Sequence, residues 1–304
     1  MKRWFAWISF LLFITLTLAC GELPVGEPDP TPTIALATLP AEGEIESGDY
    51  WLTIESGGQQ RAYKLHVPPQ YNGAAPLPLI VNMHGYGSYA EGQEWYSQMT
   101  PKADLEGFIV VYPQAAGDPA EWNLKAENNP DLDFMRAIIA ELQAKLKIDP
   151  KRIFATGISN GGGMANRMGC SMADVIAAIA PVSGGYWNWE TCQPTRPLPV
   201  VSFHGDADGI VPFEGFDAGG ENLPEIEVWA QTWAERNGCE NTPQQVYNFG
   251  AVTGEAWGNC AADATVTLYV IADEGHTWPG SVNGTPDIDA TDVILTFFEQ
   301  HPMP

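Results

Sequence analysis

The hexapeptide GISNGG, residues 157–162, decides the fold, and it directly follows the apolar run IFAT at 153–156. A serine between glycines at this spacing is typical of a sharp turn from a strand into a helix. The flanking glycines have no Cβ atom, so they avoid the clashes that such a turn would otherwise create. The turn would leave the Ser159 hydroxyl in open space, which is the geometry that a nucleophilic serine requires. The pattern alone is weak evidence, because glycine-rich turns between strands and helices are common.

Strand and helix patterns alternate on both sides of this turn. Residues 63–67 alternate in polarity, as on a half-buried antiparallel strand, whereas 79–81 and 108–111 are continuous apolar runs typical of strands covered on both faces. Residues 131–147 repeat apolar side chains at helical spacing, and Asp289 is placed to cap the last helix. This alternation predicts an α/β fold with a mostly parallel central sheet and helices on both faces. Further strands are expected at 176–182, 198–203 and 266–271, with helices from about 160 and over 225–236.

Two later segments supply an acid and a base at the ends of expected strands. The segment HGDADGIVPF at 204–213 offers Asp206 and Asp208, and a carboxylate at this position can orient a histidine and stabilise its charged form. The segment GHTWPG at 275–280 carries His276 in a loop, where it can take and return a proton. The order serine, aspartate, histidine is that of the α/β hydrolases. Since open α/β sheets place their sites at the carboxyl ends of strands, this order and topology predict a catalytic triad.

The loop MHGYG at 83–87 follows the strand expected at 79–81 and is the candidate oxyanion loop. Backbone N–H groups in such a loop can stabilise a developing oxyanion. We expect the amide of Tyr86 to be one donor, with Gly87 as the reserve, and the amide of Asn160 to be the other. His84 is expected to brace this loop as a structural histidine.

At these segments the chain resembles the extracellular esterase family that includes polyhydroxybutyrate depolymerases and type-C feruloyl or acetylxylan esterases. The resemblance extends from about residue 50 to the C-terminus. It implies that Asp208, two residues before the Ile-Val-Pro segment, is the orienting aspartate in place of Asp206. Family members often carry glycine- or cysteine-rich sequence after the Trp-Asn pair, whereas here LKAE follows at 124–127. The substrate-facing loop is therefore altered.

The resemblance implies a serine esterase that acts by acyl transfer, with Ser159, Asp208 and His276 as the triad. The substrate is expected to be a feruloyl or acetyl ester of plant polysaccharide, with a short polyester such as polyhydroxybutyrate as the alternative. Trp122 and Trp278 are expected to line the substrate cleft, because flat rings stack on phenolic acids and on sugars. A core position is the competing interpretation of these tryptophans. A non-catalytic binding lipoprotein and a peptidase remain as weaker alternatives.

The N-terminus predicts export and a membrane anchor. Residues 1–19 have a basic start and a short apolar run, as in a signal peptide, and Cys20 stands where bacterial lipoproteins are lipidated. Simple signal cleavage is the alternative. Residues 20–48 are rich in Pro, Thr, Glu and Gly and are expected to form a tether, so that 49–304 is the α/β-hydrolase catalytic domain.

Charge and cysteine content indicate which partners and cofactors the protein can bind and which disulfides it can form. The chain has 14 Lys and Arg against 38 Asp and Glu, a net charge of −24, which argues against nucleic acid as a partner. We expect no metal or other cofactor, because the cysteine spacing does not match a structural zinc site. An even number of cysteines in an exported domain indicates two disulfides, and although three pairings are possible, proximity favours neighbours in the sequence. The expected pairs are Cys170 with Cys192 and Cys239 with Cys260.

Overall fold

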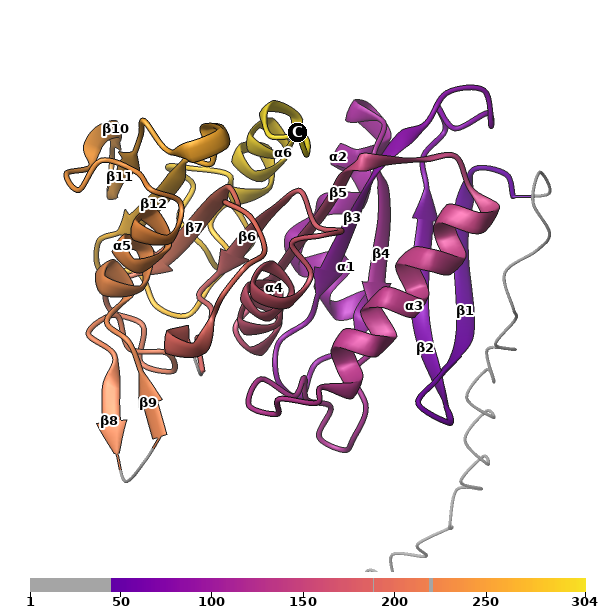
Figure 1. The fold of residues 1–304 in the computed structure, drawn as a ribbon, viewed down its shortest axis with the longest axis horizontal. Helices are drawn as coiled ribbons and strands as arrows, with labels where there is room; N and C mark the ends of the chain where they lie inside the picture. Colours follow the sequence, from indigo (N-terminus) through magenta and orange to yellow (C-terminus); the bar gives the residue numbers. More distant parts are fainter. Residues whose placement is uncertain (1–44, 188, 219–220) are drawn as a thin grey trace, which may run out of the picture. The chain divides into compact units, whose positions relative to one another are not determined.

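The computed structural model of the chain describes residues 45–187, 189–218 and 221–304 (Figure 1). The expected signal peptide at 1–19, Cys20 and most of the expected tether at 20–48 lie outside these residues. Among the described helices, none is both long enough and apolar enough to cross a bilayer.

A ten-stranded sheet forms the centre of the domain, in the order β1-β2-β4-β3-β5-β6-β7-β12-β11-β10. The six strands from β4 to β12 in this order are parallel, and antiparallel pairs extend the sheet at both ends. The strands are β1 (Gly48–Ser56), β2 (Gln59–Val67), β3 (Leu77–Met83), β4 (Ile109–Pro113), β5 (Ile148–Ile158), β6 (Ala178–Val182), β7 (Val200–Gly205), β10 (Gln244–Phe249), β11 (Val252–Trp257) and β12 (Val266–Ile271), with β8 (Phe216–Ala218) and β9 (Glu221–Leu223) in a separate hairpin.

Helices cover both faces of the sheet, and each face has its own apolar core. On one face, which is the near side in Figure 1, α3, α4 and α5 pack over the sheet through residues such as Phe134, Met164 and Trp229. On the other face, α1, α2 and α6 pack through residues such as Met99 and Phe298. The helices are α1 (Ala90–Ser97), α2 (Met99–Glu106), α3 (Pro130–Lys145), α4 (Asn160–Ser171), α5 (Ile226–Arg236) and α6 (Ala290–Gln300), with short 3-10 turns η1 (Trp189–Thr191) and η2 (Ala261–Asp263).

Local sequence signals account for where several of these helices begin. At α3, the Asn129 side chain accepts a hydrogen bond from the backbone N–H of Asp131, and Pro130 occupies the first helical position. At α6, the Asp289 side chain accepts hydrogen bonds from the N–H groups of Thr291 and Asp292. The predicted cap at Asp289 is therefore confirmed.

The predicted fold class is confirmed, since a mostly parallel sheet carries helices on both faces. The strand predicted at 266–271 coincides with β12, and the antiparallel strand predicted at 63–67 is the end of β2. The sequence did not predict α1, α2 or the antiparallel extension by β10 and β11. This extension makes the sheet longer and more mixed than the alternation of strands and helices suggested.

The register of the parallel strands brings four loops to one edge of the sheet. Met83 at the end of β3 pairs with Gly157 of β5, and Ile158 pairs with Val182 of β6. Further along the same edge, Gly205 of β7 pairs with Ile271 of β12. The segments that carry Tyr86, Ser159, Asp208 and His276 therefore emerge at the same carboxyl edge.

Two disulfides fix loops at the α4 and α5 face. Cys170 at the end of α4 is bonded to Cys192, and Cys239 after α5 is bonded to Cys260. These are the pairs that sequence proximity favoured. Disulfides persist in oxidising compartments, so they fit a domain that works outside the cytoplasm.

Candidate active site

Ser159 lies on a strained turn between β5 and α4. Its backbone has φ 59° and ψ −121°, a conformation that few non-glycine residues adopt. The turn is fixed on both sides, because the Ser159 N–H donates to Val182 O at 2.9 Å and the Ser159 carbonyl accepts from the Gly163 N–H at 2.9 Å. This is the strand-to-helix elbow that the sequence predicted around the serine.

The two glycines that flank Ser159 are required by close contact with the end of β3. A Cβ added to Gly157 would lie 2.4 Å from the Met83 carbonyl oxygen, and one added to Gly161 would lie 2.2 Å from the same atom. Backbone atoms at such distances cannot be accommodated by a side-chain rotation. The glycines therefore let β3 and the serine turn approach each other, and this places the loop after Met83 beside Ser159.

Asp208 and His276 are joined by a short hydrogen bond between Asp208 Oδ2 and His276 Nδ1, at 2.7 Å. The Asp208 side chain is fully buried, and the His276 side chain is 14% exposed. The other carboxylate oxygen of Asp208 accepts hydrogen bonds from the N–H groups of Ile210 and Val211, at 2.8 and 2.9 Å. Asp206 lies elsewhere, because its carboxylate accepts the Asp273 N–H at 2.7 Å. Of the two candidate aspartates, only Asp208 contacts His276.

The environment of Asp208 stabilises its ionised form. Burial alone would raise the pKa of Asp208, but hydrogen bonds from His204, His276 and the Val211 N–H, with the charge of His276, hold the pKa well below its ordinary value. A carboxylate in this state can orient the His276 ring and stabilise it when it takes a proton.

Hydrogen bonds from three other segments hold the loop that carries His276. The Ser183 hydroxyl donates to the Thr277 carbonyl at 3.2 Å, and the Trp278 N–H donates to the Tyr96 hydroxyl at 3.2 Å. The Trp278 indole donates to Thr291 Oγ1 at 3.0 Å. The position of the imidazole is thus set by β6, α1 and α6 together.

Two backbone N–H groups beside Ser159 are available to a ligand. Within the described residues, the amides of Tyr86 and Asn160 donate no hydrogen bond, whereas the Gly87 N–H donates to the Ala120 carbonyl at 2.8 Å. Gly87 is therefore occupied, and Tyr86 is the better candidate of the two loop amides. The Asn160 side chain exchanges hydrogen bonds with the backbone N–H and carbonyl of Trp122, at 2.7 and 3.1 Å, which fixes the start of α4 against that loop.

His84 braces this arrangement as a neutral ring. Its Nε2 accepts the Ala115 N–H at 3.1 Å and its Nδ1 donates to the Gly85 carbonyl at 2.8 Å, which fixes the tautomer. Burial lowers the pKa of His84, although the bond to Gly85 opposes that shift. The Trp122 indole donates to the His84 carbonyl at 2.8 Å. These bonds match the structural role expected for His84.

A cavity of about 480 Å³ opens at Ser159 and His276. Four of its twelve lining residues are tyrosine or tryptophan, and these four come from the segment after β3 and from α1, which the sequence did not predict as a helix. Tyr86, Tyr89 and Trp95 are each more than half exposed there, as is Ile210. The sequence signal for these residues was the aromatic density of positions 86–96, directly after the oxyanion loop. The lining residues are Gly85, Tyr86, Ser88, Tyr89, Gly92, Gln93, Trp95, Tyr96, Ile158, Ser159, Ile210 and His276.

The expected substrate contacts by Trp122 and Trp278 require correction. The two residues are 0% and 1% exposed, and both indole N–H groups are used in internal hydrogen bonds. A ring without an exposed face cannot stack on a substrate. Trp122 supports the oxyanion loop, and Trp278 anchors the His276 loop in the core.

A second hollow of about 670 Å³ adjoins the same turn on the other side of Asn160. Its lining is more polar and includes Glu121, Asn123 and Lys125, together with Trp187. The Lys125 ammonium lies 4.1 Å from the centre of the Trp187 ring. Lys125 belongs to the altered loop after the Trp-Asn pair, so that loop lines this second hollow next to Asn160.

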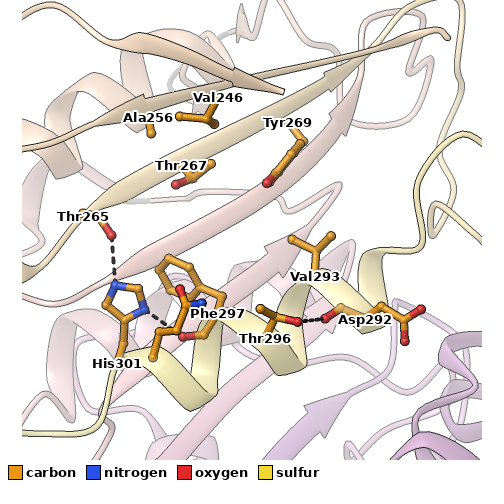
Figure 2. Close-up of a pocket in the computed structure, with 11 residues that line it drawn as sticks. Val246, Ala256, Thr265, Thr267, Tyr269, Asp292, Val293, Thr296, Phe297 and His301 are labelled. Atoms are coloured by element: carbon orange, nitrogen blue, oxygen red, sulfur yellow. Dashed lines mark hydrogen bonds between the residues drawn. The ribbon is translucent and has the colours of Figure 1, made fainter. Parts of the chain in front are cut away.

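A further pocket, of about 420 Å³, lies between α6 and the strands β10 to β12 (Figure 2). It contains His301, whose Nδ1 donates to the Phe297 carbonyl at 2.7 Å and whose Nε2 bonds with the Thr265 hydroxyl at 3.0 Å. Both ring nitrogens of His301 are thereby occupied, and burial lowers its pKa. Because this pocket contains neither Ser159 nor His276, it is not the candidate active site.

The fold and the arrangement of Ser159, Asp208 and His276 at one sheet edge define the α/β-hydrolase class. In the part of the chain that the structure describes, no group of three or more His, Cys, Asp or Glu is arranged to hold a metal ion. No model of a known protein family matches the chain.

Individual relatives nevertheless identify the family. The chain is 34% identical over 227 residues to feruloyl esterase B of Piromyces equi, a match that covers 69% of this chain but only 41% of that protein. It is 30% identical over 245 residues to a "Probable feruloyl esterase C" of Aspergillus clavatus, with 76% and 81% covered. Its fold matches the acetyl xylan esterase from Aspergillus awamori with a TM-score of 0.63 at 17% identity, with 83% and 99% covered. The chain belongs to the esterase family of feruloyl and acetylxylan esterases, and it is a carboxylic ester hydrolase.

Proposed function

We propose that the protein is an exported serine esterase that hydrolyses feruloyl or acetyl esters of plant polysaccharide through an acyl-enzyme. The observation that carries this proposal is the 2.7 Å hydrogen bond from His276 to Asp208, in a site whose cavity Ser159 and His276 line together. In such a site the buried aspartate orients the histidine, and the histidine acts as the base that activates the serine as a nucleophile.

In the first step, His276 takes the proton of the Ser159 hydroxyl as that oxygen attacks the ester carbonyl carbon. Asp208 stabilises the imidazolium that forms, and the amides of Tyr86 and Asn160 bind the negative carbonyl oxygen. Collapse of the tetrahedral intermediate breaks the bond to the alcohol oxygen, which receives the proton from His276. Water then repeats the sequence on the acyl-serine, so that the acid is released and Ser159 regains its proton.

The aromatic cavity supports an aromatic acyl group. Tyr86, Tyr89 and Trp95 present exposed rings beside Ser159, and flat rings of this kind stack on a hydroxycinnamoyl ring. The names of the two curated relatives point to the same acyl class. A short polyester chain of 3-hydroxybutyrate units is the alternative substrate, but it has no aromatic ring that could stack on these side chains.

A comparison of ester substrates tests the proposal. We expect turnover of methyl ferulate to exceed that of 3-hydroxybutyrate oligomers, and we expect acetate release from acetylated xylan. The Ser159→Ala variant should hydrolyse none of them. Rapid turnover of the oligomers together with inert methyl ferulate would replace the feruloyl assignment with the polyester one.

We further propose that residues 1–19 direct export and that Cys20 is lipidated, so that residues 20–48 tether the catalytic domain to the outer face of a membrane. The proposal rests on the sequence pattern alone. Metabolic labelling with a palmitate analogue tests it, because Cys20→Ala should abolish labelling and release the protein. Unchanged labelling in Cys20→Ala would exclude Cys20 as the lipidation site, and absent labelling of the native chain would favour simple cleavage of the signal.

A further inference from the structure

A second histidine contacts the same carboxylate oxygen of Asp208 as His276 does. His204 lies near the end of β7 and is 1% exposed, and its Nε2 is 3.4 Å from Asp208 Oδ2. The same Nε2 lies 2.9 Å from the carbonyl oxygen of Val211. His204 therefore touches both ends of the loop from Asp208 to Val211.

The partners of His204 determine its tautomer. A carbonyl oxygen only accepts hydrogen bonds, so Nε2 must carry a hydrogen, which it donates to the Val211 carbonyl at 2.9 Å while Asp208 Oδ2 lies at the longer distance of 3.4 Å. The other nitrogen, Nδ1, is buried and has no partner within the described residues, and the nearest aromatic ring is that of Phe213, 6.1 Å away between centroids. A buried N–H without an acceptor costs more than an unused lone pair, so the hydrogen is placed on Nε2 in preference to Nδ1.

Both oxygens of the Asp208 carboxylate have partners. Oδ1 accepts the backbone N–H groups of Ile210 and Val211, and Oδ2 is shared between His276 at 2.7 Å and His204 at 3.4 Å. The Val211 carbonyl accepts from His204 while the Val211 N–H donates to Asp208, so the loop closes on itself through His204. The plane of the carboxylate is thereby fixed relative to the His276 ring.

We propose that His204 is a positioning residue of the triad, which uses its Nε2–H to hold Asp208 in the orientation that His276 requires. The inference rests on the proposed function, since it assigns a role only if Asp208 orients the base. It also gives a reason for a buried histidine at a strand end where an apolar residue would otherwise pack. The charged or titratable groups that it faces are Asp208 and, across the shared oxygen, His276.

The proposal predicts a specific effect on the acid limb of activity. A second donor on Oδ2 withdraws negative charge from the oxygen that faces His276. Without that donor, Oδ2 would stabilise the imidazolium that forms during the reaction more strongly. The acid limb of the pH profile of kcat/KM should therefore move to higher pH. If the loss of His204 only loosened the loop, the rate would fall but the acid limb of the pH profile would stay at the same pH.

Two variants of similar size separate the donor from simple packing. His204→Leu removes the N–H, whereas His204→Gln can keep an amide N–H near the position of Nε2. We expect His204→Leu to lower kcat by roughly 10- to 100-fold, the range for losing a hydrogen bond to a charged group, with KM changed by less than about twofold. His204→Gln should recover most of that loss and restore the acid limb.

A double-mutant cycle tests whether His204 acts through Asp208. In an Asp208→Asn background, His204→Leu should cost less than about threefold further, because the carboxylate that it positions is gone. A loss of the same size in both backgrounds, or equal loss in the Leu and Gln variants, would overturn the proposal, as would a His204→Leu enzyme of unchanged kcat. Thermal unfolding of each variant checks that the fold is retained. Full activity of Ser159→Ala would instead refute the proposed function itself.

Discussion

Ser159 combines a partly buried side chain at the cavity with a backbone conformation that costs folding free energy. A residue held at φ 59° and ψ −121° is destabilising by about 1–3 kcal/mol, and it persists because the surrounding hydrogen bonds overdetermine it. The strain coincides with a serine that lines the same cavity as His276. The observed outlier therefore supports a functional role for this residue.

The two aspartates of the 204–213 segment should differ sharply in their effect on rate. Asp208→Asn leaves the geometry nearly intact but removes the charge that stabilises His276, so kcat should fall by about 10⁴-fold. Asp206→Asn should cost less than about fivefold, because among the described residues the Asp206 carboxylate accepts only the Asp273 N–H. Initial rates on methyl ferulate or p-nitrophenyl acetate measure both. If Asp206→Asn lowered kcat more than Asp208→Asn did, the acid of the triad would be Asp206.

Asp208 should also make the fold sensitive to acid. Its pKa in the folded state lies below that of an unfolded chain, which is about 3.9. The stabilisation that the ionised carboxylate contributes is therefore complete above the unfolded value and is lost as the pH falls through the folded value. Urea unfolding at pH 5 and pH 3 should show a smaller loss of stability in Asp208→Asn than in the native chain. If both proteins lost the same stability between pH 5 and pH 3, the folded state would not stabilise the ionised form of Asp208.

At the scale of elements, the contact between β3 and the serine turn depends on the absence of Cβ atoms at Gly157 and Gly161. Gly161→Ala would place a methyl carbon 2.2 Å from the Met83 carbonyl and 2.5 Å from the His84 carbonyl. We expect a loss of at least about 3 kcal/mol of stability, or failure to fold, and loss of esterase activity in any folded fraction. Gly258→Ala is the matched control, because nothing lies within 4 Å of its added Cβ. Similar melting temperatures for the two variants would contradict the close approach.

The elements that the sequence predicted well are those whose burial gives a clear pattern. Residues 266–271 are largely apolar, with Thr267 as the exception, lie between two neighbouring strands, and form β12 as predicted. By contrast, α1 contains Gly92 and two exposed aromatic residues, Tyr89 at its cap and Trp95, so its periodicity did not indicate a helix. The strand β10 is largely exposed and carries little apolar signal.

The same reasoning explains which site residues could be predicted. Ser159, Asp208 and His276 stand at strand ends in short motifs, and their order carries information that is independent of packing. Trp122 and Trp278 looked like substrate contacts because an indole suits both a core and a ligand. Only the packing of the folded chain shows that Trp122 lies under the oxyanion loop and that Trp95 is the exposed ring.

At the scale of the whole molecule, the disulfides should contribute to stability more than to catalysis. Each closes a loop of about 20 residues, with sequence separations of 22 and 21. Replacing Cys170 and Cys192 together by serine should lower the free energy of unfolding by about 2–4 kcal/mol, while the esterase rate at low temperature should stay within about threefold. Chemical denaturation under non-reducing conditions measures the first quantity. A stability unchanged by the double substitution would contradict this expectation.

The central claim, that Ser159 is the nucleophile of an ester hydrolase, is tested most directly with a fluorophosphonate probe. The native protein should gain the mass of one phosphonyl group, which peptide mapping should place on Ser159, and its turnover of methyl ferulate should stop in proportion. Ser159→Ala should stay unlabelled and should hydrolyse the ester at least about 10⁴-fold more slowly. Labelling at another residue, or undiminished turnover by Ser159→Ala, would contradict the assignment.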